Sequence, residues 1–176
     1  QLICNEVDRI AALIDRMQDF TTDRTLECHP GNIYPLIDRA AGIAAAGFAK
    51  NIKIIKHYDP SLPFATINDD ALVQVMINLL KNALDVLKQL NNPESAKCIE
   101  VSIAQNANQQ LYLEVSDNGT GISDHVIEMI FVPFFTTKQQ GSGIGLSLSR
   151  QIMLNHGGDL VYIKRQQGAC FRCVFG

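Results

Sequence analysis

Two hairpin patterns in the second half of the sequence constrain the fold more than any other feature. The first joins strands expected at about 98–105 and 110–116 through a polar turn, and the second joins 160–165 to 170–175 through a turn at Gly168. Antiparallel hairpins, with no regular strand–helix–strand alternation around them, do not build a doubly wound parallel sheet. The sequence therefore predicts an α/β two-layer sandwich, in which a mixed sheet is covered by about three helices.

Helical patterns precede and separate these hairpins. A helix over 32–47 is expected with Asn32 as its N-cap, and the longest helix opens at Asn68 and runs to about Leu90. Its apolar residues recur at helical spacing and predict a buried stripe of Leu72, Val75, Met76, Leu79, Ala83 and Val86. Shorter helices are expected near 124–129 and at 145–155. Strands are also expected over 52–58 and, briefly, at 27–28.

The first twenty residues form a separate pattern. The 3.5-residue repeat of a coiled-coil seam is formed by Ile3, Val7, Ile10, Ile14 and Met17. Another helix must cover this seam, either within the same domain or in an interhelical bundle or dimer, and the narrow seam favours the bundle. Because the chain starts at Gln1 without a Met, we expect it to be a piece of a longer protein. The predicted units are a bundle helix at 1–20 and a domain at 21–176.

The composition allows one ordinary domain with a short extension and excludes several classes of protein. Of the 176 residues, 47% are hydrophobic and 19% are charged, which supports a real core. Fifteen Lys and Arg against eighteen Asp and Glu argue against a nucleic-acid surface or a polybasic membrane anchor. The longest apolar stretch, Ala40–Ala49, is too short to span a membrane. Five cysteines indicate a reduced, cytosolic protein, and the single Cys170-Phe-Arg-Cys173 motif lacks the four ligands of a zinc site.

Two asparagines of the long helix stand four residues apart, and therefore on one helical face beside the apolar stripe. They are Asn78 and Asn82, and Lys81 lies three residues after Asn78. Amides at this spacing can direct oxygens at a cation while the lysine neutralises phosphate. The alternative, which is the commoner role for such a pair, is that the two amides bridge neighbouring elements.

An aspartate continues the apolar face of the strand at 110–116. The odd residues from Leu111 to Val115 share one face, and Asp117 extends their alternation just before Gly119 and Gly121. Two glycines at this spacing permit a positive φ and close approach of a ligand to the backbone. A carboxylate at the floor of an apolar pocket can accept a hydrogen bond from an exocyclic amine, such as that of adenine. The alternative is an ordinary Asp-Asn-Gly turn.

An aromatic segment and a glycine-rich segment follow. Phe131-Val-Pro-Phe-Phe135 predicts a compact aromatic clamp or, alternatively, a core plug beneath a loop. Gly141, Gly143 and Gly145 then lead into a helix, whose N-terminus and exposed backbone N–H groups favour phosphate. The preceding strand of a Rossmann fingerprint and the Gly-Lys-Ser/Thr of a P-loop are both absent from this segment.

Taken in order, these four motifs resemble the catalytic, ATP-binding domain of sensor histidine kinases, in the wider family that includes gyrase, Hsp90 and MutL. They correspond to the family's N, G1, F and G2 boxes and span Asp70 to about Gly158. The resemblance implies a Bergerat-type fold, with ATP and Mg²⁺ as cofactors, and phosphoryl transfer by positioning and charge neutralisation. A narrower resemblance, to nitrogen-regulation kinases of the NtrB type, rests on the stretch from Cys4 to Pro63.

The resemblance implies a role for each motif. Asn82 would ligate Mg²⁺, Asn78 would support the metal and the phosphates, and Lys81 would contact phosphate, so that these three are the implied catalytic residues. Asp117 would accept from the adenine amine, and residues 131–143 would form the ATP lid. The other implied nucleotide contacts are Gly119, Gly121, Ile122, Phe131, Thr137, Lys138, Gly141, Ser142, Gly143, Ile144, Gly145 and Leu146.

Two departures from the family's patterns refine this interpretation. ATP-hydrolysing relatives carry a glutamate at the position of Asn78 as general base for water, so the resemblance implies a phosphotransferase. None of the four histidines matches the family's phosphoacceptor motif, which lies on the first helix of a dimerisation hairpin. The helix at 1–20 would be the second helix of that hairpin. The γ-phosphate would therefore pass to a histidine outside this chain and then to a response-regulator aspartate.

The partners implied are a response-regulator receiver domain, the protein's own hairpin and, in the full-length protein, a second copy of itself. We expect neither nucleic-acid nor membrane contact by this fragment, and a cytoplasmic location, as a soluble protein or as the cytoplasmic portion of a membrane-bound sensor. Three alternatives stay open: an ATP-binding regulatory (pseudokinase) module, an ATPase of the same fold, and a purely structural dimerisation piece.

Overall fold

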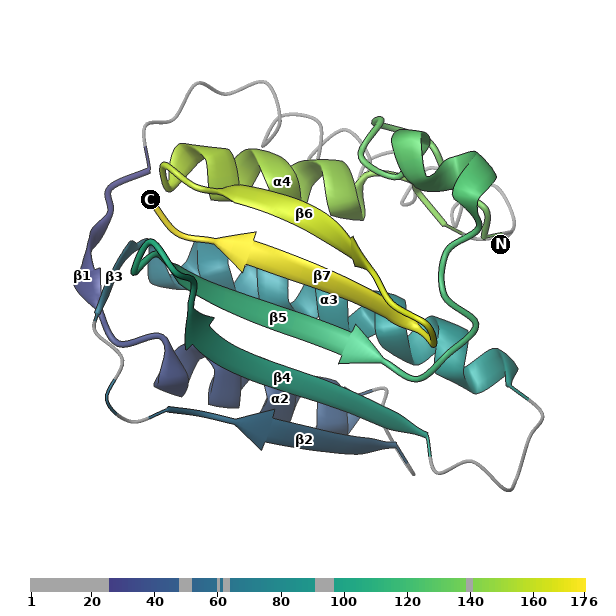
Figure 1. The fold of residues 1–176 in the computed structure, drawn as a ribbon, viewed down its shortest axis with the longest axis horizontal. Helices are drawn as coiled ribbons and strands as arrows, with labels where there is room; N and C mark the ends of the chain where they lie inside the picture. The colour runs from purple at the N-terminus through teal and green to yellow at the C-terminus, as the bar shows by residue number, and fades with distance from the viewer. Residues whose placement is uncertain (1–25, 48–51, 60, 62–63, 91–96, 139–140) are drawn as a thin grey trace, which may run out of the picture.

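The fold was analysed in a computed structural model, which describes residues 26–47, 52–59, 61, 64–90, 97–138 and 141–176. Figure 1 shows two layers in these residues, a twisted sheet and helices against one of its faces. The expected α/β two-layer sandwich is therefore confirmed. The expected helix at 1–20, and with it the proposed domain boundary, lies outside the described residues.

Within the described ranges, the main sheet has five strands in the order β2-β4-β5-β7-β6. The strands are β2 (Lys53–His57), β4 (Cys98–Gln105), β5 (Leu111–Asp117), β6 (Asp159–Lys164) and β7 (Ala169–Val174). β2 pairs with β4 in parallel and every other pair is antiparallel, so the sheet is mixed. The two predicted hairpins are present, and they join through β5 and β7. This junction places Asp117 beside the turn of the second hairpin.

Three α-helices cover one face of the sheet in the described part of the chain: α2 (Tyr34–Gly47), α3 (Asp69–Gln89) and α4 (Gly145–Asn155). A short 3₁₀ helix, η1 (Asp124–Met129), precedes α4. The N-cap predicted at Asn68 is confirmed, whereas α2 begins at Tyr34, two residues after the predicted cap Asn32, whose side chain still binds the helix start. The side-chain oxygen of Asn68 accepts a hydrogen bond from the backbone N–H of Ala71, and that of Asn32 accepts one from Tyr34.

A second, two-stranded sheet was not predicted. β1 (His29–Gly31) pairs antiparallel with β3 (Ala65–Ile67) beside the start of α3. The strand expected at 27–28 is therefore displaced by two residues. Its position depends on its pairing with β3, and a pattern confined to a few residues does not show that pairing.

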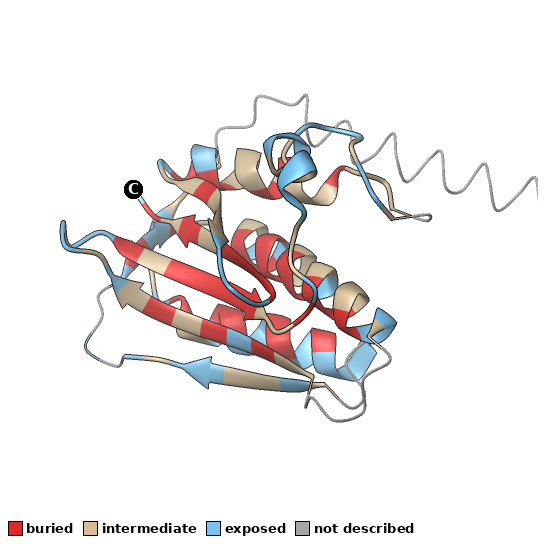
Figure 2. Ribbon diagram, turned by 45° about the vertical axis from the view of Figure 1, so that its right-hand side comes forward, coloured by how far each residue is buried: buried red, intermediate tan, exposed pale blue. Residues whose placement is uncertain are grey.

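The core lies between the sheet and the helices, where Figure 2 shows the buried positions concentrated on the inner sides of both layers. Five of the six residues of the predicted α3 stripe are at most 5% exposed. The sixth, Val86, is only half-buried, and Leu80, Leu84 and Leu87 complete the buried face instead. Val86 faces Gly119, since a Cβ placed on that glycine would lie 2.6 Å from its Cγ1. One edge of α3 thus borders the loop after β5.

Candidate functional site

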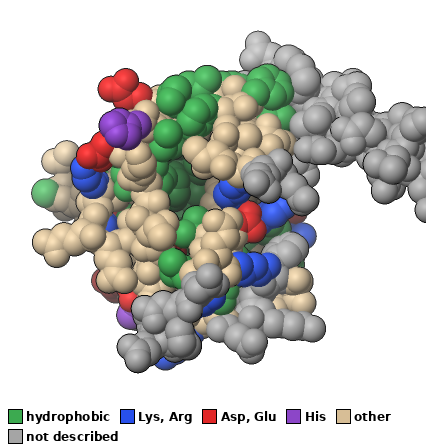
Figure 3. Space-filling view, turned by 90° about the vertical axis from the view of Figure 1, so that its right-hand side faces the viewer, with side chains coloured by type: hydrophobic (Ala, Val, Ile, Leu, Met, Phe, Trp, Pro, Cys, Tyr) green, Lys and Arg blue, Asp and Glu red, His purple; other side chains and the backbone are tan. Residues whose placement is uncertain are grey.

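The four sequence motifs meet at one end of the molecule, between α3, the end of β5 and the segment that leads into α4. Gly119 lies against Val86 of α3, Asn78 of α3 contacts Gly145 of α4, and Lys138 contacts Asn82. In Figure 3, which views the molecule from this end, apolar side chains line a recess, and basic and acidic side chains lie beside it. The motifs are therefore neighbours in space as well as consecutive in sequence.

Asp117 ends β5 with one carboxylate oxygen held by the backbone. Its Oδ1 accepts hydrogen bonds from Gly119 N at 2.8 Å and from Ala169 N at 3.3 Å. Burial raises the pKa of Asp117 by more than these two N–H groups lower it. Within the described residues, no hydrogen bond reaches Oδ2. This half-buried carboxylate therefore holds one oxygen in place and leaves the other for a donor from outside.

The turn of the second hairpin forms one wall beside Asp117. Gly168 has a φ of +74°, and a Cβ at this position would lie 1.7 Å from the carbonyl oxygen of Asp117. Only a glycine permits both this backbone conformation and this approach. A Cβ on Gly121 would in turn lie 2.9 Å from the Gly168 carbonyl oxygen, and Ile122 packs against the core nearby. The sequence patterns did not predict Gly168 and Ala169 as site residues, because their position beside Asp117 depends on the pairing of β5 with β7.

Asn78 connects α3 to α4. Its Nδ2 donates to Ser149 Oγ at 3.2 Å and to the carbonyl oxygen of Gly145 at 3.4 Å. In the structure this amide thus has the bridging role considered as the alternative. It holds the start of α4 against α3 at the point where the glycine-rich segment enters the helix. Ser149 is fully buried and was not singled out in the sequence.

Asn82 lies one turn further along α3 and contacts a cation supplied by the protein itself. Its Oδ1 accepts a hydrogen bond from Lys138 Nζ at 2.9 Å, and the same Nζ lies 2.9 Å from Asp85 Oδ2. Lys81 is exposed. Asp85 is a further residue that the motif analysis missed, since nothing in the local pattern shows that a lysine more than fifty residues later would reach it.

The aromatic segment does not form the compact clamp. Phe131 packs edge-on to Phe171 with ring centroids 6.4 Å apart, and the Arg150 guanidinium lies 5.0 Å from the Phe131 centroid. Phe134, in contrast, is 58% exposed. Phe131 therefore packs beneath the loop, as the core-plug alternative expects, whereas the exposed Phe134 lies on the surface. Arg150 is itself fixed by a bidentate pair with Asp159, at 2.9 and 3.2 Å.

The start of α4 has no side-chain cap. Ile144 occupies the N-cap position and, among the described residues, makes no side-chain cap hydrogen bond to the helix. Gly143 has a φ of +70°, and its carbonyl oxygen accepts from Phe134 N at 3.0 Å, so the glycine-rich segment folds back on the aromatic one. Among the other predicted contacts, Ile144 is buried, Thr137 is exposed, and Gly141, Ser142 and Leu146 are half-buried. Uncapped N–H groups at a helix start suit an anionic ligand.

The oxygens at this end of the site suit a hard divalent cation. Mg²⁺ prefers oxygen ligands and commonly takes one or two from the protein and the rest from phosphate and water. The Asn82 and Asp85 oxygens already surround one positive charge, the Lys138 ammonium. The described residues contain no cluster of three or more His, Cys, Asp or Glu that could hold a metal unaided. The donor set thus fits a cation that arrives with a phosphate ligand.

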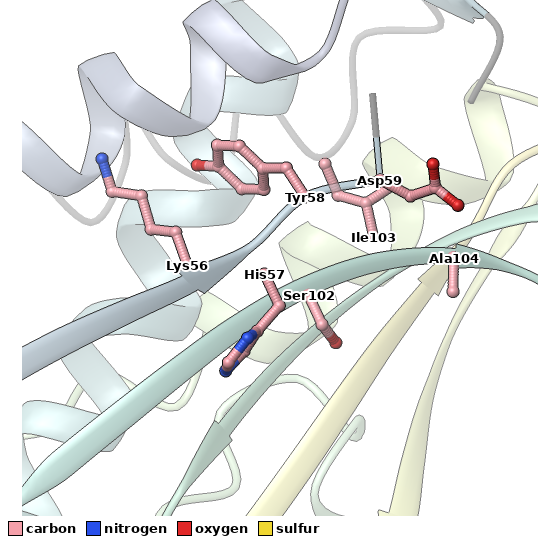
Figure 4. A pocket seen from close by; sticks show the side chains of 7 residues that line it. All are labelled: Lys56, His57, Tyr58, Asp59, Ser102, Ile103 and Ala104. Carbon is pink, nitrogen blue, oxygen red and sulfur yellow. The ribbon is translucent and has the colours of Figure 1, made fainter. Parts of the chain in front are cut away.

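A separate depression of about 710 Å³ lies at the other edge of the sheet and has no part in this site. Residues of β2, β4 and the loop after β2 line it (Figure 4): Lys56, His57, Tyr58, Asp59, Ser102, Ile103 and Ala104. Lys56 and Tyr58 point to the helical side of the sheet, whereas His57 and Ser102 point to the other. Because its side chains do not converge, this depression lacks the chemistry of a ligand site.

The Cys170–Cys173 motif does not form a joint metal site. The two residues stand three apart on β7, so their side chains project from opposite faces of the sheet. Burial raises the pKa of Cys170 to about 11 and that of Cys173 to about 12, which keeps both thiols protonated near neutral pH. Both are free cysteines in the described part of the chain.

Over the described ranges, every helix is too short or too polar to cross a bilayer.

Comparison with known proteins gives one family model, described as "Histidine kinase-, DNA gyrase B-, and HSP90-like ATPase", which matches residues 67–175. Two relatives are both named sensory histidine kinase/phosphatase NtrB. The one from Rhizobium meliloti (strain 1021) is 43% identical over 99% of this chain and 48% of its own length. The one from Azospirillum brasilense is 36% identical over 98% of this chain and 45% of its own length. The chain thus spans about half the length of these curated relatives.

Two solved structures share the fold. The nucleotide-free catalytic domain of histidine kinase ThkA has a TM-score of 0.72 and 28% identity, covering 85% of this chain and 95% of that one. Histidine kinase ThkA in complex with response regulator protein TrrA has a TM-score of 0.76 and 25% identity. The match covers 99% of this chain and 49% of the ThkA chain. All four motifs lie within residues 67–175, the region that the family model matches.

Proposed function

We propose that this chain, which belongs to the histidine kinase-, DNA gyrase B- and HSP90-like ATPase family, is the ATP-binding catalytic domain of a sensor histidine kinase. It would transfer the γ-phosphate of ATP to a histidine outside this chain, for relay to a response-regulator aspartate. The observation that carries the proposal is the carboxylate of Asp117, with Oδ1 fixed by two backbone N–H groups and Oδ2 left for a donor.

Asp117 would recognise adenine. Its Oδ2 would accept a hydrogen bond from the exocyclic amine, and its burial makes that bond selective, because an unpaired buried polar group costs about 1–3 kcal/mol. Gly119, Gly121 and Ile122 would border the ring, and Gly168 would close the pocket from the second hairpin. The close packing of Gly168 on Asp117 supports a fixed wall.

The phosphates would lie at the start of α4, opposite Asn78 and Asn82. The uncapped first turn supplies N–H groups, and the bridging amide of Asn78 holds that turn against α3. Lys81, Thr137, Lys138 and residues 141–146 would surround the phosphate chain, and residues 131–143 would form the lid. Phe131, packed between Phe171 and Arg150, would anchor the first residue of that lid.

Asn82 would hold Mg²⁺ together with the phosphate oxygens, with Asn78 supporting it from the preceding turn. When bound, the metal neutralises phosphate charge and orients the γ-phosphoryl group. Asn78 also bears on the choice between transfer and hydrolysis. Its amide cannot act as a general base, and both its described donor contacts go to α4. This supports a phosphotransferase over an ATPase.

The relatives support a wider assignment. They are named as NtrB kinases, and the ThkA structure contains the response regulator TrrA. We therefore propose a response-regulator receiver domain as partner, residues 1–20 as the end of a dimerisation hairpin in a homodimer, and 21–176 as the catalytic domain. A cytoplasmic site of action, in a soluble or a membrane-bound parent, is part of the same proposal.

The test combines this chain with a histidine-bearing hairpin fragment of its parent protein and with ATP labelled in the γ-phosphate. Label on the fragment, lost with Asn82→Ala and retained with the remote variant Lys56→Met, is the expected result. ATP binding without any transfer would instead show a regulatory pseudokinase module. Steady release of phosphate by the isolated chain would show an ATPase, and no nucleotide binding at all would leave a structural dimerisation piece.

A further inference from the structure

Lys138, Asn82 and Asp85 form a three-membered contact that the four motifs do not account for. The Lys138 ammonium lies 2.9 Å from an amide oxygen of Asn82 and 2.9 Å from a carboxylate oxygen of Asp85. Both acceptors come from α3, where a spacing of three residues places them on one face. The side chains of Lys138 and Asp85 are each 32% exposed, so this is a half-buried contact rather than a surface ion pair.

The arrangement is a cation seat, by which we mean the Asn82 Oδ1 and Asp85 Oδ2 atoms together. Amide and carboxylate oxygens are the protein ligands that a small hard divalent cation prefers. An ammonium that donates to both oxygens uses the lone pairs that such a cation would need. The seat can therefore hold the lysine or the metal, but not both at once.

We propose that Asp85 joins Asn82 as a ligand for the nucleotide-bound divalent cation, and that Lys138 fills the seat when no nucleotide is present. This inference rests on the proposed function of the same site. Arrival of the metal with ATP releases the ammonium, which then lies beside the phosphates and can pair with them. Lys138 thus keeps the carboxylate of Asp85 neutralised between nucleotides and prevents it from repelling the incoming phosphates.

Another lysine pair of the protein supplies the matched control. Lys56 Nζ lies 2.6 Å from Asp38 Oδ1, with side chains 34% and 54% exposed, at the opposite edge of the sheet from α4. The second acceptor of the seat, an amide oxygen, has no counterpart there. Asp38 instead accepts from the hydroxyl of Tyr58. Removing Lys56 takes away a comparable charge at a place where no metal is expected.

The first experiment measures Mn²⁺ binding to this chain without nucleotide, by electron paramagnetic resonance. Lys138→Met should empty the seat and tighten Mn²⁺ binding by about tenfold, the size expected for one charge-assisted hydrogen bond. Lys56→Met should leave it unchanged, and adding Asp85→Asn to Lys138→Met should abolish the gain. Persistence of the gain in that double variant would overturn the proposal.

Salt separates direct competition from a long-range effect of charge. At 0.5 M NaCl the Debye length is only about 4 Å, so an effect of the lysine on a distant cation would largely disappear. Competition for the same two oxygens would remain. A gain seen at low salt and lost at high salt would therefore also overturn the proposal.

The second experiment titrates Mg²⁺ into the chain with a fluorescent ATP analogue. Asp85→Asn should raise the Mg²⁺ concentration for half-maximal binding about tenfold while leaving binding in EDTA unchanged, with a thermal melt to confirm folding. The same Mg²⁺ dependence in the variant and the original chain would refute the role of Asp85 alone. Failure of both chains to bind ATP would instead refute the proposed function. The Mn²⁺ experiment would still show whether Lys138 and a divalent cation compete for the Asn82 and Asp85 oxygens.

Discussion

The two ends of the site are built in different ways. At the Asp117 end, strand and turn backbone fixes the acceptor through the N–H groups of Gly119 and Ala169, with the Gly168 turn packed against it. At the Asn82 end, side chains of α3 make the contacts, with the side chains of Ser149 and Lys138 and with one backbone acceptor, the carbonyl oxygen of Gly145. We infer that the first end is preorganised in the sheet, whereas the second exchanges partners when charge arrives. We therefore expect base recognition to be rigid and phosphate binding to be adjustable.

The largest effect should come from Asp117→Asn. The asparagine Oδ1 can keep both backbone hydrogen bonds, but its amide then presents a donor to the donor amine of adenine. A buried site built for one hydrogen-bond pattern rejects the mismatched one strongly, so we expect ATP affinity to fall about a thousandfold. Calorimetric titration of the variant measures this loss. Unchanged affinity would mean that Asp117 does not contact the base.

The same variant should be no less stable than the original chain at neutral pH. Because burial raises the pKa of Asp117 in the folded state, the unfolded chain releases this proton at lower pH than the folded one. Ionisation of Asp117 therefore lowers the free energy of unfolding as the pH rises between the two pKa values, and the full cost is present above them. Because asparagine does not ionise, the variant avoids this loss in the free energy of unfolding. A variant clearly less stable at neutral pH would show that the charge itself is stabilising.

The wall beside Asp117 should be the next most sensitive feature. Gly168→Ala places a Cβ against the Asp117 carbonyl at a φ of +74°, and we expect a loss of about 2 kcal/mol in the free energy of unfolding. Gly42→Ala is the matched control, since nothing lies within 4 Å of its Cβ in helix α2, and it should stabilise by about 0.5–1 kcal/mol. Chemical denaturation measures both. Equal effects would show that the wall is not tightly packed.

How far the sequence predicted each end follows from this difference. Asp117, Gly119 and Gly121 alternate along one strand end and turn, so local alternation and glycine spacing indicated them, and the family resemblance supplied their expected roles. Gly168 and Ala169 reach them only through the pairing of β5 with β7, which neither hairpin pattern specifies. At the other end, Asn78 and Asn82 follow from helical spacing, but Ser149, Asp85 and Lys138 choose their partners by side-chain packing between elements. The sequence therefore predicted which elements lie together at the candidate site and missed most contacts between them.

A moderate effect is expected from pH on ATP binding. The Oδ2 atom of Asp117 is a strong acceptor while the carboxyl is ionised, but on protonation it would carry the proton and present a donor to the adenine amine, and the pKa of this carboxyl is raised by burial. ATP affinity should therefore weaken as the pH falls towards that raised pKa, approaching a loss of about tenfold per pH unit below it. The Asp117→Asn variant should lack this dependence, which a titration series at falling pH will show. A parallel pH response in both chains would assign it to another group.

The smallest effect, and the one that separates the two ends most cleanly, should come from Ser149→Ala. The substitution removes the Oγ acceptor at 3.2 Å from Asn78 Nδ2 and leaves only the longer contact to Gly145 O. Losing one neutral hydrogen bond of about 1 kcal/mol should loosen the start of α4 and weaken ATP binding about fivefold. Adenosine, which has no phosphates, should bind the variant and the original chain equally. If adenosine binding fell as well, the two ends would be coupled through α4, and the adjustable end would not be independent of the rigid one.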